Sequence, residues 1–239
     1  MKKIGLLVNP IAGMGGRVGL KGTDGEGILE KAIALGAVQE APEKAKKALG
    51  KVVELKDKFK VFTASGLMGE EECKELGLDY EVVYNAAEKS SVTDSRELLK
   101  YFLDNGIELI FFVGGDGTAR DVYSVVEDKI PVIGVPAGVK IHSPVYGNTP
   151  EQAGSLLFEV INGVELPVIE KDVVDIDEDA FRDDRVEVRL YGYLKVPFDQ
   201  RYLQNKIIYP AHVLLEHLLR VYARVALFWL YFSVFAAVL

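Results

Sequence analysis

The sequence predicts an α/β protein built on an open, mostly parallel, Rossmann-like sheet. Between residues 4 and 167, short apolar runs rich in β-branched residues alternate with longer stretches of helical periodicity, which is the pattern of a parallel sheet covered by helices. Glycine, proline or a capping hydroxyl marks many boundaries between these segments. Of the 239 residues, 49% are hydrophobic and 27% are charged, a composition typical of a globular chain with one large or two small domains.

The expected elements follow this alternation in order. We place five strands at residues 4–8, 60–63, 80–84, 108–113 and 131–135. We place helices at residues 42–56, 70–76, 94–104, 119–128 and 150–161. Thr93 and Thr149 are the expected N-caps, and Gly77, Gly106 and Gly163 suit the C-terminal ends of helices.

Charge and cysteine content argue against several classes of protein. The formal net charge is -8 and the pI is about 5.1, which disfavours a nucleic-acid binder because such proteins carry basic surfaces that displace counterions from phosphates. Cys73 is the only cysteine, so no intramolecular disulfide forms and a reducing, cytoplasmic location is expected. Neighbouring glutamates oppose thiolate formation at Cys73. The first apolar run, residues 4–8, is too short for a secretory signal, and no membrane location is expected.

A glycine-rich loop with one carboxylate follows the most hydrophobic strand. Residues 108–113 show almost no alternation, which predicts a central strand buried on both faces. Ligands of open α/β sheets bind beyond the carboxyl ends of the strands, where the loop Gly114-Gly115-Asp116-Gly117-Thr118 lies. A second glycine-containing loop begins at Asn9, after the first strand. Both loops are therefore expected to converge on one ligand.

The residue types in the loop at 114–118 suit phosphate chemistry. Glycines let the main chain approach a phosphate, and the helix that follows directs free amide groups at it. Asp116 would repel phosphate unless it accepted a proton from an attacking hydroxyl or held magnesium through water. The alternative is that Asp116-Gly117 is only a tight turn; its place beyond a central strand favours function.

Two further loops complete the candidate site. The glycines after Asn9 match neither G-x-G-x-x-G nor the Walker sequence, which disfavours a dinucleotide dehydrogenase or a Walker-type ATPase. Lys140 follows the fifth strand and is expected to neutralise phosphate charge, whereas His142 is interpreted as a polar loop residue.

Three segments give the sequence a specific resemblance. Gly-Leu-Leu-Val-Asn-Pro at 5–10, Val-Gly-Gly-Asp-Gly-Thr-Ala-Arg-Asp at 113–121 and Gly-Val-Pro-Ala-Gly-Val-Lys-Ile-His-Ser at 134–143 resemble the NAD kinase superfamily. The resemblance is strongest to its archaeal ATP-NAD kinase-like group and covers roughly residues 4–200. The superfamily also contains diacylglycerol and sphingosine kinases, which share the Gly-Gly-Asp-Gly-Thr loop.

The resemblance implies an enzyme that phosphorylates NAD. It implies ATP or polyphosphate as the donor, the 2′-hydroxyl of the adenosine ribose of NAD as the acceptor, and Mg²⁺ or another divalent cation as cofactor. Asp116 matches the family's catalytic base. The residues assigned to nucleotide binding are Asn9, Pro10, Gly114, Gly115, Gly117, Thr118, Arg120, Asp121 and Lys140; no metal ligand is assigned.

Two departures from the family pattern leave alternatives open. NAD kinases commonly carry an Asn-Glu pair that recognises adenosine, and this sequence has no Asn-Glu dipeptide. A lipid kinase of the diacylglycerol or sphingosine type is therefore one alternative function. A non-catalytic nucleotide-binding protein, lacking part of the site, is the other.

The second departure is the C-terminal part of the sequence. Alternation within residues 185–196 predicts antiparallel strands, and the chain from residue 207 is largely apolar. We therefore expect an α/β domain at 1–165, a partial β-rich domain at 166–203 and an atypical apolar helical tail at 204–239. The abrupt change of composition favours a frameshifted or truncated end over a packing helix or a membrane-surface helix. Exposed apolar surface on such a tail would favour a homo-oligomer.

Overall fold

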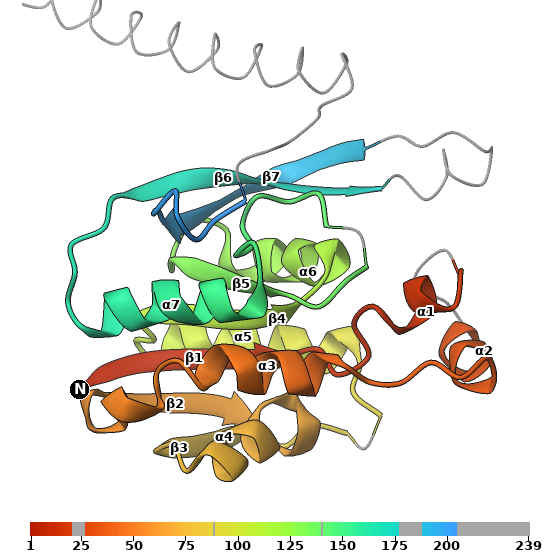
Figure 1. Ribbon diagram of the computed structural model, residues 1–239, viewed down its shortest axis with the longest axis horizontal. Helices are drawn as coiled ribbons and strands as arrows, with labels where there is room; N and C mark the ends of the chain where they lie inside the picture. Colours follow the sequence, from red (N-terminus) through yellow and green to blue (C-terminus); the bar gives the residue numbers. More distant parts are fainter. Residues whose placement is uncertain (21–26, 88, 140, 177–187, 205–239) are drawn as a thin grey trace, which may run out of the picture. The chain divides into compact units, whose positions relative to one another are not determined.

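The computed structural model (Figure 1) describes residues 1–20, 27–87, 89–139, 141–176 and 188–204. One compact unit comprises Met1–Asp175 and Tyr191–Lys206, and the main sheet, its helices and the candidate site all belong to it. The other unit contributes only residue 176 and residues 188–190 to the described part, at the ends of two strands. The predicted helical tail beyond residue 204 and the predicted site residue Lys140 lie outside the described residues.

Five parallel strands form the central sheet, and all five strands expected from the sequence are confirmed. They run in the order β3-β2-β1-β4-β5. The register between β1 and β4 extends from Ile4 opposite Leu109 to Val8 opposite Val113. The strands are β1 Lys2–Val8, β2 Phe59–Ala64, β3 Tyr80–Tyr84, β4 Leu109–Gly114 and β5 Val132–Pro136.

This strand order places a topological switch point between β1 and β4. The chain builds outward from β1 through β2 to β3, and then returns to the other side of β1 to form β4 and β5. The crossovers therefore diverge at the carboxyl ends of β1 and β4, which is the place where open α/β sheets bind ligands. Asn9 and the loop at 114–118 follow these two strands.

Helices cover both faces of the sheet. In Figure 1, α3 and α7 pack side by side on one face and α5 and α6 pack together on the other. Short helices connect the remaining segments. The α-helices are α1 Met14–Arg17, α2 Ile28–Ala34, α3 Ala41–Leu49, α4 Glu70–Leu76, α5 Val92–Asp104, α6 Asp116–Val126 and α7 Pro150–Ile161; the 3-10 helices are η1 Val53–Lys58 and η2 Gly66–Met68.

Three expected helix boundaries are wrong. The helix expected at 42–56 ends at Leu49, because the chain turns after Gly50 and continues as the separate helix η1. Ser91, and not Thr93, is the N-cap of α5, where Ser91 and Asp94 form a reciprocal capping box. Helix α6 begins at Asp116 instead of residue 119. Because α6 begins three residues earlier than expected, the carboxylate of Asp116 lies in its first turn.

Two strands lie among the described residues of the predicted β-rich region after residue 166. They are β6 Val168–Ile176 and β7 Val188–Pro197, and they pair in a two-stranded antiparallel sheet. The division into domains at residues 165 and 203 stays a prediction. Across the described ranges, every helix is too short or too polar to cross a membrane.

Candidate functional site

The loops after β1 and β4 meet directly at the carboxyl edge of the sheet. The Asn9 amide N–H continues the parallel pairing by donating to the Val113 carbonyl at 3.0 Å. Its side-chain Nδ2 donates to Thr118 Oγ1 at 3.0 Å, and its Oδ1 accepts from the Ile11 amide at 3.3 Å. Asn9 thus joins the first loop to the loop at 114–118, and the convergence of the two loops on one ligand stays a prediction.

Glycine is required where the loops make their closest approaches. Gly13 has a φ of 81°, and a Cβ there would lie 2.5 Å from the Ala137 carbonyl oxygen. A Cβ on Gly114 would lie 2.3 Å from Thr118 Oγ1. The Ala137 amide donates to the Gly114 carbonyl at 2.8 Å. The loop after β5 therefore packs against both other loops. A side chain at Gly13 would push the first loop away from Ala137, and one at Gly114 would collide with Thr118 within its own loop.

Asp116 lies in the first turn of α6 with its carboxylate bound by the main chain of a third loop. The His142 amide donates to Oδ2 at 2.7 Å, and the Ser143 amide donates to Oδ1 at 3.0 Å. Asp116 is only 6% exposed. Burial raises its pKa, although the two amide hydrogen bonds act in the opposite direction. A raised pKa makes the carboxylate a better proton acceptor.

Two buried hydroxyls anchor the loop that holds Asp116. The Ser143 Oγ donates to the Val174 carbonyl at 2.8 Å and accepts from the Val174 amide at 3.1 Å. The Tyr146 hydroxyl donates to the Gly115 carbonyl at 2.5 Å. Burial, followed by the charge of Asp116, raises the pKa of Tyr146 well above its ordinary value. Tyr146 therefore remains a neutral hydrogen-bond donor.

Three other residues predicted to bind nucleotide, namely Arg120, Asp121 and Pro10, do not take part in the contacts that hold Asp116. Arg120 pairs with Asp175 at 3.2 Å, and Asp121 pairs with Arg96 at 3.3 Å. Pro10 is buried in the first loop. Arg120 and Asp121 thus lie on α6 beyond the loop and already take part in ion pairs, and their contact with a nucleotide stays a prediction.

The sequence interpretation missed Lys44 as well as Ser143 and Tyr146. Lys44, on α3, donates from Nζ to the Ala137 carbonyl at 3.1 Å and lies 3.6 Å from Glu40 Oε2. Glu40 also pairs with Arg17. Nothing in the local sequence around Lys44 indicates this contact, because it joins segments 93 residues apart. Ser143 does lie in a segment that carries the family resemblance.

The site residues do not form a metal cage. In the part of the chain that the structure describes, no group of three or more His, Cys, Asp or Glu side chains is placed to hold a metal ion. Both oxygens of Asp116 accept hydrogen bonds from amides. The described residues therefore do not match an all-protein metal site, which normally presents several oxygen, nitrogen or sulfur ligands.

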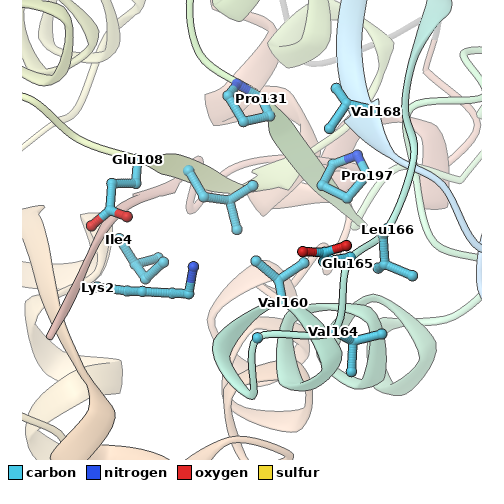
Figure 2. A pocket seen from close by; sticks show the side chains of 12 residues that line it. Lys2, Ile4, Glu108, Pro131, Val160, Val164, Glu165, Leu166, Val168 and Pro197 are labelled. Atoms are coloured by element: carbon cyan, nitrogen blue, oxygen red, sulfur yellow. The ribbon is translucent and has the colours of Figure 1, made fainter.

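A separate cavity lies at the opposite edge of the sheet. It has a volume of about 300 Å³ and is lined at the starts of strands by Lys2, Ile4 and Leu109, with Val160 and Leu166 from the end of α7 and beyond. Figure 2 shows the side chains around it. None of the residues assigned to the site from the sequence lines this cavity, so it is distinct from the loops around Asp116.

The fold and the loops together define a class of protein. A doubly wound parallel sheet, with a glycine-aspartate loop at its switch point and at the start of a helix, is a nucleotide-binding α/β architecture. Comparison with known families shows which family within this class the chain belongs to. Residues 4–164 match the ATP-NAD kinase N-terminal domain, and the chain belongs to the NAD kinase family.

Comparison with individual proteins gives less detail. One solved structure that matches is an NAD kinase from Archaeoglobus fulgidus in complex with ATP, with 20% identity and a TM-score of 0.25. The match covers 54% of this chain and 44% of that one. No curated protein matches. The chain thus spans less than half of the length of this neighbour.

Proposed function

We propose that this chain transfers a phosphoryl group to the 2′-hydroxyl of the adenosine ribose of NAD, forming NADP. The proposal depends on Asp116, a buried carboxylate held by two amides at the start of α6 and at the switch point of the sheet. Membership of the ATP-NAD kinase family supports ATP as the donor. Inorganic polyphosphate is the alternative donor, because it presents the same terminal phosphate.

The proposed reaction divides between the loop backbone and one side chain. The glycine loop and the free amides at the start of α6 hold the phosphates of the donor. Asp116 accepts the proton of the 2′-hydroxyl as that oxygen forms a bond to the terminal phosphorus. The bond from phosphorus to the bridging oxygen breaks, and ADP or a shortened polyphosphate leaves. Positioning and charge neutralisation dominate such a transfer because its transition state is loose.

The divalent cation expected for the family has no protein cage among the described residues. Mg²⁺ commonly binds through substrate phosphates and water with one or two protein oxygens. We therefore propose that a cation enters with the donor phosphates. A cytoplasmic location and self-association through the C-terminal tail also remain proposals.

The decisive experiment is an assay of NADP formation by the full chain. Purified protein is incubated with NAD, Mg²⁺ and either ATP or polyphosphate, beside Asp116→Asn. Product from the parent and not from the variant would support the reaction and the role of Asp116, and would identify the donor.

The same assay separates the alternative functions. Absence of the Asn-Glu pair favours a different acceptor, so diacylglycerol and sphingosine replace NAD in parallel reactions with labelled ATP. Phosphorylated lipid without NADP would contradict the proposal and favour a lipid kinase. If ATP and NAD raise the melting temperature but no acceptor is phosphorylated, the chain is a nucleotide-binding protein without turnover.

A further inference from the structure

The loop that holds Asp116 is attached to β6 by a buried serine side chain, in addition to the bond from the Tyr146 hydroxyl to Gly115 in the loop before α6. Ser143 is 0% exposed. Its amide donates to Asp116 Oδ1, while its Oγ bonds to both the amide and the carbonyl of Val174 in β6. One residue therefore connects the carboxylate at the start of α6 to a strand outside the five-stranded sheet.

The rest of the loop is anchored on a different side. The Val145 carbonyl accepts from the Gly134 amide at 3.0 Å, and the Gly147 amide donates to the Gly134 carbonyl at 2.9 Å. These bonds attach the loop to β5, downstream of the residues that contact Asp116. They do not replace the attachment to β6, because Ser143 lies two residues before Val145 and faces Val174.

We propose that Ser143 is a positioning residue for the Asp116 carboxylate, acting by holding the His142–Ser143 amides against its two oxygens. Removing Oγ would leave the amide and the carbonyl of Val174 without this partner and free the loop to move away from α6. A carboxylate held by two amides has one orientation. A carboxylate released from them samples several, and small misplacements of a reacting group reduce the rate steeply.

The effect of Ser143 on catalysis rests on the proposed function. Its effect on the position and the pKa of Asp116 does not depend on turnover. The amides of Ser143 and His142, and the Ser143 side chain itself, lower the pKa of Asp116 against the larger opposing effect of burial. Loss of these hydrogen bonds should therefore raise the pKa of Asp116 further. Among the described residues, the titratable groups beside this carboxylate include His142 on the same loop and Tyr146; Asp175, the partner of Arg120, acts in turn on Tyr146.

The test compares Ser143→Ala with Ser143→Cys and a matched control. Cysteine keeps the size of the side chain with a weaker donor and acceptor. Ser155→Ala is the control, because Ser155 Oγ also bonds to a backbone carbonyl, that of Glu151, but lies on α7 away from Asp116. Carbon-13 NMR of aspartate carboxyl groups, with Asp116→Asn to assign the resonance, measures the pKa of Asp116 whether or not the chain turns over.

We expect the pKa of Asp116 to rise in Ser143→Ala, to rise less in Ser143→Cys and to stay unchanged in Ser155→Ala. If the parent forms NADP, kcat/KM should fall about tenfold to a hundredfold in Ser143→Ala, and the acidic limb of its pH profile should move to higher pH. Stabilisation of the protein by ATP should be retained. A folded Ser143→Ala or Ser143→Cys in which Asp116 titrates as in the parent would overturn the proposal. Absence of NADP formation by the parent would instead count against the proposed function alone.

Discussion

Two buried carboxylates lie in the first turns of two helices and have opposite surroundings. Asp116 begins α6 and accepts an amide hydrogen bond at each oxygen. Glu72 lies in the first turn of α4, is 1% exposed, and neither of its oxygens has a hydrogen-bond partner in the described ranges. Burial raises the pKa of both, and that of Glu72 reaches about 7.

The difference shows that burial alone does not determine how a carboxylate behaves. Amide hydrogen bonds at Asp116 favour the charged form, oppose the effect of burial and hold the carboxylate in a fixed orientation. At Glu72 the nearby backbone amide and the charge of Lys46 do not offset burial, so the protonated form is favoured below about pH 7. A substitution at Asp116 should therefore change turnover, whereas a substitution at Glu72 should change stability.

The largest expected effect is the loss of turnover in Asp116→Asn. An amide is close in size to the carboxylate but does not accept the proton of the acceptor hydroxyl, and general bases contribute about 10²–10⁴-fold to rates. We expect kcat for NADP formation to fall in that range while ATP still raises the melting temperature. Glu72→Gln is the matched control, since it makes the same chemical change at the other buried carboxylate. An unchanged rate in Asp116→Asn would exclude Asp116 as the base.

The second prediction concerns the dependence of stability on pH in Glu72→Gln. The folded pKa of Glu72, about 7, lies above its ordinary value of 4.5, so the folded state binds the proton more tightly than the unfolded state. The stability that this proton contributes is full below pH 4.5 and is lost as the pH rises through 7. At pH 8, glutamine should stabilise the protein relative to the parent by about 1–3 kcal/mol.

Urea denaturation of both proteins at pH 5 and pH 8 measures this difference. The advantage of Glu72→Gln should shrink toward pH 5, because the parent carboxyl is then largely protonated when folded. Equal stability of the two proteins at both values would mean that Glu72 reaches water or a partner and does not titrate as a buried group.

The strands and the site loop could be predicted from the sequence, whereas the burial of Glu72 could not. Residues 108–113 have no polar side chain after Glu108, and only a central strand accommodates such a run. Glu70, Glu71 and Glu72, in contrast, look like a solvated acidic stretch. The third of them points inward because the packing of α4 fixes its face, which short-range periodicity in a seven-residue helix does not determine.

The start of α6 was missed for a related reason. Its N-cap is Gly115, which has extended backbone and no side chain to form a capping hydrogen bond, so the sequence carries no capping signal there. The contacts of Ser143 with Val174 and of Lys44 with Ala137 were missed because they join distant segments. Local patterns predicted where the loop at 114–118 lies, and only the tertiary structure shows what holds it.

A third prediction tests whether replacing a glycine of the site loops costs more stability than replacing a glycine elsewhere in the chain. Gly13→Ala adds a methyl group in the left-handed region and 2.5 Å from the Ala137 carbonyl, whereas Gly36→Ala has a similar φ of 87° but nothing within 4 Å. We expect Gly36→Ala to cost about 1 kcal/mol and Gly13→Ala about 1–2 kcal/mol more. Urea denaturation measures both. Equal costs would show that the first loop moves away from the loop after β5 without penalty.

The smallest expected effect uses Cys73 to test whether ionisation of Glu72 loosens α4. Burial, followed by the charge of Glu72, raises the pKa of the adjacent thiol to about 12, so alkylation requires the helix to open. At pH 8, Glu72→Gln should slow the labelling of Cys73 by iodoacetamide about fivefold, because it removes the charge that favours the open form. Labelling in urea should be similar for both proteins, which controls for the reactivity of the thiol itself. Equal rates in the native proteins would mean that α4 tolerates the buried charge. The missing hydrogen bonds of Glu72 would then have no effect on how often this helix opens.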